Sequence, residues 1–194
     1  ALDIVQLMNF LNSTQAHKVE LLGIADDGPQ RMQFMQRLFI EITKRGCVDV
    51  LRSGIKHGPA SIELFYGTPS EENFNAQELN SCNIFSVTRQ LRYSTDERAL
   101  ALDLCVFING LPVVSFELKN KLTKQTVHDA VQQYRRDRDD KEPLFQFGRC
   151  LVHFAVDDHE VRMCTALQGN SSWFLPFNKG YRDGAGNPPN PDGI

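Results

Sequence analysis

The 194-residue chain lacks several features that would place it in a specialised class of protein. No apolar run approaches the roughly 20 residues of a membrane-spanning helix, and no signal peptide is recognisable. The 21 Lys and Arg residues do not outnumber the 24 Asp and Glu residues, so the net charge of −3 provides no general basic surface for nucleic acid. What remains is an ordinary globular composition, 41% hydrophobic and 23% charged, in a chain long enough to bury a sizeable core.

Paired cysteines are also missing. The five cysteines are odd in number and scattered, and none forms a C-x-x-C pair, which argues against a disulfide framework and against a zinc site. Cys105 and Cys150 lie in apolar runs and are expected in the core. A reducing cytoplasm is therefore the expected location.

A phosphate-binding loop of the form G-x-x-x-x-G-K-[ST] is absent, so this chain does not itself contain an ATP-driven motor. Residues 178–194 include ten Gly, Pro and Asn among 17 residues and show no hydrophobic periodicity. We therefore expect one domain over residues 1–177, followed by a linker over residues 178–194 that leads into a further part of a longer protein.

Hydrophobic periodicity predicts an α/β fold. Helices are expected over residues 29–45 and 123–138, with apolar residues at spacings of three and four. Their predicted buried stripes are Met32, Met35, Leu38, Phe39 and Ile42 in the first helix, and Val127, Ala130, Val131 and Tyr134 in the second. Strands are expected over residues 61–67, 83–94, 102–108, 111–119, 150–156 and 161–167. Within this series, a core order of helix, strand, strand, strand, helix, strand predicts a mixed central β-sheet flanked by helices.

Acidic residues interrupt two apolar strands on either side of the Asn-Gly pair at residues 109–110. Asp103 lies in the first strand, and Glu117 lies in the second, two residues before Lys119. A buried carboxylate is costly unless it is paired or bound to a metal, so something must compensate for these acids. Because residues two apart in a strand share a face, Glu117 and Lys119 project together. The core face of the first strand is expected to hold Leu102, Leu104, Val106 and Ile108.

The turn decides whether Asp103 joins Glu117. A two-residue loop, the usual result of Asn-Gly, would place Asp103 opposite Phe116 and leave the two acids on opposite faces. A loop of three or five residues, or a bulge, would place the acids directly opposite each other. Pro112 favours this irregular version, because it cannot donate a ladder hydrogen bond. We expect an odd-numbered loop or a bulge over residues 109–112, and carboxylates that converge to roughly 4–6 Å.

Two converging carboxylates repel each other unless a cation compensates for their charge. Hard oxygen ligands suit magnesium, which takes one or two carboxylates together with substrate phosphate. Lys119, one pleat from Glu117, would reach the same phosphate or the attacking water. This combination predicts metal-assisted hydrolysis of a phosphodiester. The alternative interpretation is a surface ion pair between Glu117 and Lys119 at a strand end.

Four segments resemble a known family: NIFSVTRQLRYS, LDLCVFINGLPVVSFELKNKLTKQT, AVQQYRRDR and FLPFNKG. Together they resemble the N-terminal part of the restriction (R) subunit of type I restriction–modification enzymes, within the PD-(D/E)xK nuclease superfamily. The block NGLPVVSFELKN is the most specific element, and the resemblance covers nearly the whole chain. It implies a restriction-endonuclease-like αβββαβ core in a nuclease domain fused to an ATP-driven DNA translocase.

The resemblance also implies roles for individual residues. Asp103, Glu117 and Lys119 would be the catalytic residues of a magnesium-dependent endonuclease, in which manganese can substitute. Asp103, Glu117 and the backbone carbonyl of Leu118 would hold the metal, while Lys119 would orient the nucleophile and stabilise charge on the phosphate.

The sequence departs from the pattern of related nucleases in the helix that follows the hairpin. Related nucleases carry Gln-x-x-x-Tyr there, whereas Tyr134 is preceded four residues earlier by Ala130, with glutamines at 132 and 133. The role of Gln132 or Gln133 therefore stays open, and Tyr134 is equally well explained as a residue that packs the helix on the sheet. The candidates for contact with DNA are Lys121, Lys124, Gln133, Tyr134, Arg135 and Arg136.

Other ionisable residues are weaker candidates. Some relatives place an acid from the first helix near the metal, which would be Glu41 here, although a glutamate facing solvent is the simpler interpretation. The basic clusters are equally well interpreted as solvated surface. His153, within the apolar run CLVHFAV, is expected to be a hydrogen-bonded core histidine rather than a metal ligand.

The function expected from these observations is that of the endonuclease domain of a type I R subunit. It would hydrolyse double-stranded DNA after translocation by the rest of the subunit, which would bind the ATP. The expected partners are the methylation (M) and specificity (S) subunits, and no membrane. Two competing interpretations are a non-catalytic domain of the same fold that grips DNA or docks subunits, and a stand-alone resolvase- or repair-type nuclease.

Overall fold

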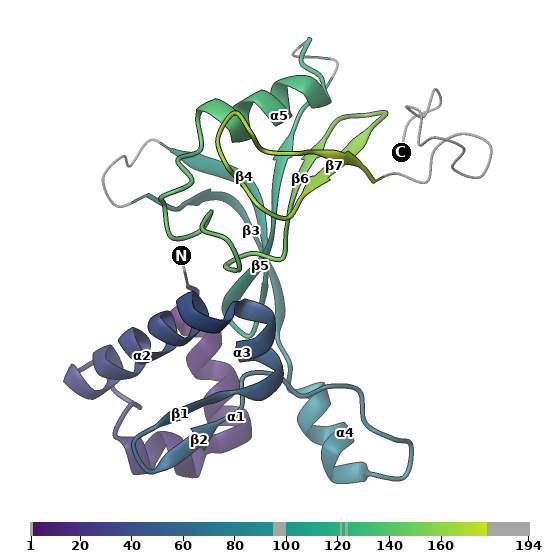
Figure 1. The fold of residues 1–194 in the computed structure, drawn as a ribbon. Coiled ribbons are helices and arrows are strands. Elements are labelled where there is room, and N and C mark those ends of the chain that lie inside the picture. Colours follow the sequence, from purple (N-terminus) through teal and green to yellow (C-terminus); the bar gives the residue numbers. More distant parts are fainter. Residues whose placement is uncertain (1, 95–99, 121, 123, 178–194) are drawn as a thin grey trace. The chain divides into compact units, whose positions relative to one another are not determined.

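A computed structural model describes residues 2–94, 100–120, 122 and 124–177, which form two compact units (Figure 1). The first, called here the helical unit, comprises residues 2–86 together with residues 107–112. The second, the sheet unit, comprises residues 87–106 and the described residues from 113 onward. The predicted linker at residues 178–194 lies outside the described residues.

The helical unit is built from α1 (Ile4–Leu22), α2 (Pro29–Arg45), α3 (Cys47–Ser53) and α4 (Phe74–Ser81), with a two-stranded sheet of β1 (Ile55–His57) and β2 (Ala60–Ile62). The predicted helix at residues 29–45 is confirmed, and Pro29 occupies its first turn as its fixed φ allows. Its buried stripe differs from the prediction: Phe34, Leu38 and Ile42 are buried, whereas Met32 and Phe39 are exposed. The buried side is therefore rotated relative to the predicted one.

The sheet unit contains most of a six-stranded sheet in the order β3-β4-β5-β6-β7-β8. Its strands are β3 (Phe85–Arg92), β4 (Ala101–Ile108), β5 (Leu111–Leu118), β6 (Val152–Val156), β7 (Val161–Cys164) and β8 (Leu175–Pro176). β5 and β6 are parallel, whereas β7 pairs antiparallel with both β6 and β8. A parallel neighbour requires a crossover connection, and α5 (Val127–Arg136) provides it (Figure 1). The predicted α/β fold, with a mixed sheet and a restriction-endonuclease-like core, is confirmed.

α5 is fixed against the sheet by its apolar stripe and by its first turn. Its buried residues are Val127, Ala130, Val131 and Tyr134, as the periodicity predicts. At its start the Thr126 backbone N–H donates to the Asp129 carboxylate over 2.7 Å, and the Val127 N–H donates to Asp157 over 2.7 Å. Asp157 follows β6 directly, so this contact ties the beginning of the helix to the end of the neighbouring strand.

The hairpin turn is shorter than predicted. β4 ends at Ile108 and β5 begins at Leu111, and the two residues between them both have positive φ, +49° at Asn109 and +81° at Gly110. This two-residue loop is the ordinary outcome for Asn-Gly, so the predicted odd-numbered loop or bulge over residues 109–112 is wrong. The preference of Asn-Gly for a two-residue turn is therefore stronger than the effect of Pro112.

The turn residues are themselves buried in the helical unit. The Asn109 side-chain amide donates to the Leu64 carbonyl over 2.9 Å, and its oxygen accepts the Ile84 N–H over 2.6 Å. The Asp3 N–H donates to the Gly110 carbonyl over 2.9 Å. Asn109 thus provides hydrogen bonds that these buried backbone groups would otherwise lack. The turn is therefore held in place within the helical unit.

Burial within β4 does not follow a single face of the strand. Cys105 and Phe107 alternate as buried residues, but the next buried position is Leu102, three residues before Cys105. The predicted core face is therefore wrong beyond Leu102: Leu104, Val106 and Ile108 are only half-buried.

Gly110→Ala tests how tightly the turn is held. A Cβ at this position would lie 2.3 Å from the Asp3 carbonyl oxygen and 2.7 Å from the Leu7 nitrogen, at a φ that L residues avoid. We expect the free energy of unfolding to fall by about 2–4 kcal/mol, measured by urea denaturation. Gly67→Ala is the matched control, because no atom lies within 4 Å of its Cβ position. Equal effects of the two substitutions would show that the turn is not tightly packed.

Candidate active site

Two alternate residues of β5, and Lys119 directly after the strand, each contact α5 or the segment that follows it. Ser115 shares a 2.8 Å hydrogen bond with the Tyr134 hydroxyl. Glu117 accepts from Arg138, which follows the C-terminal end of α5. The Lys119 ammonium donates to Gln133 Oε1 over 2.5 Å. Period-two alternation brings these side chains to one face of the strand, so Glu117 and Lys119 project together as predicted.

Glu117 is a fully buried carboxylate, 0% exposed, paired with a buried arginine. Arg138 Nε and Nη2 both lie 2.6 Å from Glu117 Oε1. The other contacts of the guanidinium are equally defined: Nη1 donates to the Tyr93 hydroxyl over 3.1 Å and Nη2 to the Ala101 carbonyl over 2.8 Å. Such a pair is stable only because the hydrogen bonds of both ions are largely satisfied.

The second oxygen of this carboxylate accepts no hydrogen bond from Arg138. Among the described residues, Glu117 Oε2 is buried without a hydrogen-bond partner. Burial raises the pKa of Glu117 to about 7; Arg138 opposes the shift, and the neighbouring Asp103 carboxylate adds to it. A buried carboxylate oxygen without a donor is uncommon, and a cation, a water molecule or a proton shared with Asp103 would each satisfy it.

Asp103 is oriented by two donors. The Leu118 backbone N–H donates to Asp103 Oδ2 over 2.8 Å, and the Gln90 side-chain amide donates to Oδ1 over 3.1 Å. Gln90 adopts φ +50°, an unusual conformation for this residue type within a strand. The contact with Leu118 places Asp103 at the end of β5, and the two acids are neighbours despite the two-residue turn.

Lys119 is fixed at both its backbone and its side chain. Its N–H donates to the Val156 carbonyl over 2.8 Å, at the end of β6, while its ammonium contacts Gln133. Gln132 is exposed, whereas Gln133 is half-buried on the side of α5 that faces the sheet. The structure therefore selects Gln133 over Gln132 as the glutamine next to the candidate site.

Tyr134 belongs to a buried polar network. It is 0% exposed, and the Ser115 hydroxyl bridges it to His153 Nδ1 at 2.7 Å. Burial lowers the pKa of His153 to about 4, so the imidazole is neutral at physiological pH. The prediction that His153 is a hydrogen-bonded core residue is confirmed. Tyr134 packs α5 on the sheet and is not accessible to DNA in this structure.

The remaining candidates for contact with DNA differ in exposure. Lys124 and Arg136 are exposed, whereas Arg135 is half-buried and donates twice to the Ser172 carbonyl, at 2.8 and 3.2 Å. Lys121 lies outside the described residues. Arg136 and Lys124 are therefore the members of this set whose charges face solvent among the described residues.

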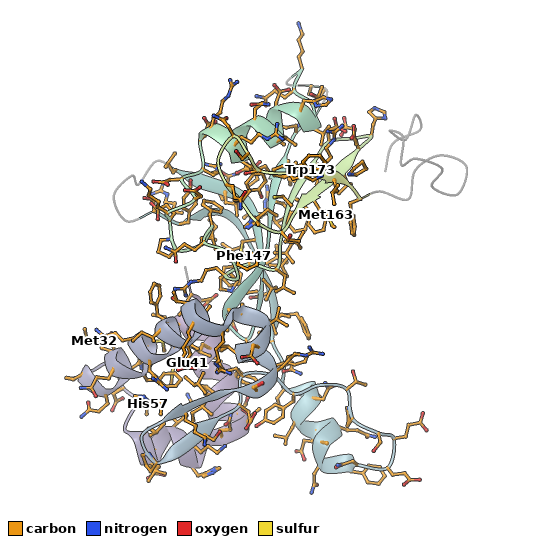
Figure 2. All side chains as sticks on the ribbon, viewed as in Figure 1. Met32, Glu41, His57, Phe147, Met163 and Trp173 are labelled. Carbon is orange, nitrogen blue, oxygen red and sulfur yellow. The ribbon has the colours of Figure 1, made fainter. Side chains whose placement is uncertain are left out.

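Glu41 lies on α2 in the helical unit (Figure 2). Its carboxylate accepts from Arg37 at 2.9 Å and from Arg45 at 2.8 Å, and the residue is 9% exposed. Both oxygens are thus occupied by cations of the same helix, spaced four residues on either side. This pairing accounts for Glu41 without any role at a metal. Because the residue is buried, the simpler interpretation of a glutamate facing solvent is also wrong.

The acid pair fits a hard divalent cation. Two carboxylates in close proximity, one with a buried oxygen that lacks a partner, form an oxygen donor set that suits magnesium or manganese. Asp103 and Glu117 would hold the ion. In the part of the chain that the structure describes, no group of three or more His, Cys, Asp or Glu residues gathers as an alternative metal site.

Sequence reasoning missed two residues of the site. Arg138 lies four residues after Tyr134 and so continues the buried stripe of α5, a spacing that distinguishes it from Arg135 and Arg136. Gln90 could not have been found in this way, because nothing in its sequence context indicates a positive φ.

These features define a nuclease-like α/β fold with an acidic pair and a lysine at the ends of adjacent strands. The family model described as "Type I restriction enzyme R protein N terminus" matches residues 35–172. The chain belongs to this family. No helix among the described residues is both long and apolar enough to cross a membrane.

A relative from Methanocaldococcus jannaschii bears the name "Putative type I restriction enzyme MjaIXP endonuclease subunit". It is 36% identical over 81 residues, which are 42% of this chain but only 8% of that protein. No solved structure gives a significant match. The match therefore concerns a small part of a much longer relative.

The raised pKa of Glu117 predicts a pH dependence of metal binding. A metal ligand must be deprotonated, so with a pKa of about 7 the affinity for Mn²⁺ should rise about tenfold from pH 6 to pH 8 and then level off. Titration with Mn²⁺ at pH 6, 7 and 8 measures this. Glu160→Gln, which alters an acid paired with Arg162 instead, should leave the profile unchanged. An affinity that is flat over this range would contradict the assignment of Glu117 as a ligand.

Proposed function

We propose that this chain is the magnesium-dependent endonuclease domain of a type I restriction enzyme R subunit. Its substrate would be the phosphodiester backbone of double-stranded DNA. The single observation that carries the proposal is Glu117 Oε2, a buried carboxylate oxygen without a hydrogen-bond partner beside the Asp103 carboxylate. Membership of the R-protein family and the name of the relative support the same conclusion.

In this mechanism Asp103 and Glu117 would hold the ion, and the Leu118 carbonyl would be a further ligand. A bound divalent cation supplies positive charge at the phosphate and lowers the pKa of attacking water. Lys119 orients the nucleophile and stabilises the negative charge that develops on the phosphate as the sugar oxygen leaves. Gln133 holds the Lys119 ammonium in place through its 2.5 Å contact.

The rest of the proposal concerns the longer protein. The matched part of the relative is 8% of its length, which leaves ample chain for an ATP-driven translocase. We propose that ATP is bound there, that translocation precedes cleavage, and that the complex includes methylation and specificity subunits in the cytoplasm. Lys124 and Arg136, with their exposed charges, are the proposed DNA contacts among the described residues.

The proposal is tested by cleavage with the complete enzyme. Glu117→Ala and Lys119→Ala should each lower the rate of double-strand cleavage by at least about 10²-fold, because each removes a group that acts on the reacting phosphate. ATP hydrolysis should continue, which shows that the assembled complex is intact. Cleavage at the normal rate in Glu117→Ala would refute the nuclease assignment and favour a domain that only grips DNA or docks subunits.

A pair of adjacent glutamines tests the positioning of Lys119. Gln133→Ala removes the acceptor of the ammonium and should slow cleavage about tenfold, the usual scale for a residue that orients a functional group. Gln132→Ala changes an exposed neighbour on the same helix and should cleave normally. Equal rates for both variants would mean that Lys119 does not need Gln133.

A further inference from the structure

The environment of Glu117 bears on how many metal ions the site can hold, an inference that rests on the proposed function. Two-ion nuclease sites place their ions about 3.5–4 Å apart and use carboxylate oxygens that face both of them. In this chain one side of the Glu117 carboxylate is already occupied. Arg138 Nε and Nη2 each lie 2.6 Å from Oε1.

The guanidinium is not free to move aside. Arg138 is 4% exposed, and it also donates to the Tyr93 hydroxyl and to the Ala101 carbonyl. Its carbon atom lies 5.5 Å from the centre of the Tyr93 ring, within the range of a cation–π contact. A second metal ion at Oε1 would have to displace a buried cation that has several other partners.

Asp103 offers little additional capacity. Each of its oxygens already accepts one hydrogen bond, from Leu118 and from Gln90, so each keeps only part of its acceptor capacity. Glu117 Oε2 is the carboxylate oxygen of the pair without a donor among the described residues. The donor set therefore suits one ion that completes its coordination with water and substrate oxygens.

The charges lead to the same conclusion. When both acids are deprotonated, as metal ligands must be, Asp103 and Glu117 carry two negative charges, and Arg138 and Lys119 carry two positive charges. One divalent cation would make the site positive enough to attract a phosphodiester, which has a single negative charge. A second ion would add two further charges next to a fixed guanidinium, at a large electrostatic penalty in a buried site.

The geometry points to Arg138 as an internal cation in the place of a second metal ion, so that the acid pair holds a single divalent ion. Arg138 is thus a positioning residue. It fixes the orientation of the Glu117 carboxylate and leaves only Oε2 available to the metal.

The test counts Mn²⁺ ions bound by the 194-residue chain and by Asp103→Asn, a substitution at a half-exposed position, using equilibrium dialysis. We expect the substitution to remove one ion. The electron paramagnetic resonance spectrum of the bound ion should be that of an isolated Mn²⁺, without coupling to a neighbour. A loss of two ions, or a coupled spectrum, would overturn the one-ion inference and leave the nuclease proposal intact. No difference between the two chains would mean that the acid pair binds no metal, and would refute both.

Variants of Arg138 provide a second measurement. Arg138→Ala removes the internal cation and should allow a second Mn²⁺ to bind at millimolar concentration, with a coupled spectrum. Arg138→Lys keeps a positive charge and should still bind one ion. An Arg138→Ala chain that is folded by circular dichroism but binds one ion with unchanged affinity would show that Arg138 does not take the place of a metal. Should that variant fail to fold, the ion count of the unaltered chain decides the question.

Discussion

The burial of the Glu117 carboxylate is the constraint on which the rest of the site depends. A carboxylate that is 0% exposed requires compensation, and loss of the partner of a buried ion typically costs about 3–5 kcal/mol. Arg138 provides that compensation. Because its guanidinium also contacts Tyr93 and Ala101, the same interaction ties the end of α5 to the segments near β3 and β4. The acid is thus held in place before any metal is bound.

Much of the fold could be predicted, because its elements carry strong periodicity. The stripe of α5 follows spacings of three and four, and all four of its predicted residues are buried. The hairpin was located correctly, but its turn was misjudged, because Asn-Gly chemistry outweighed the effect of Pro112. The predicted face of α2 was rotated, since Met32 and Phe39 satisfy helical spacing as well as Phe34 does. Apolar spacing alone does not decide which side of such a helix is buried.

The site could be predicted in part. Asp103, Glu117 and Lys119 could be proposed from residue type and spacing, but the reason given for their convergence was wrong, because the turn at Asn109 and Gly110 has only two residues. The buried stripe of α5, extended by four residues, would have identified Arg138. Gln90 could not be found, since its contact with Asp103 depends on a backbone conformation that its sequence does not encode locally.

Anomalous diffraction from crystals of this chain soaked in manganese tests the central claim most directly. The account predicts a peak between the carboxylates of Asp103 and Glu117, next to Oε2, that disappears in Asp103→Ala. A well-ordered site with Arg138 in contact with Glu117 and no peak at saturating manganese would contradict it. The acid pair would then be a structural ion cluster, and the domain would be better explained as one that grips DNA or docks subunits.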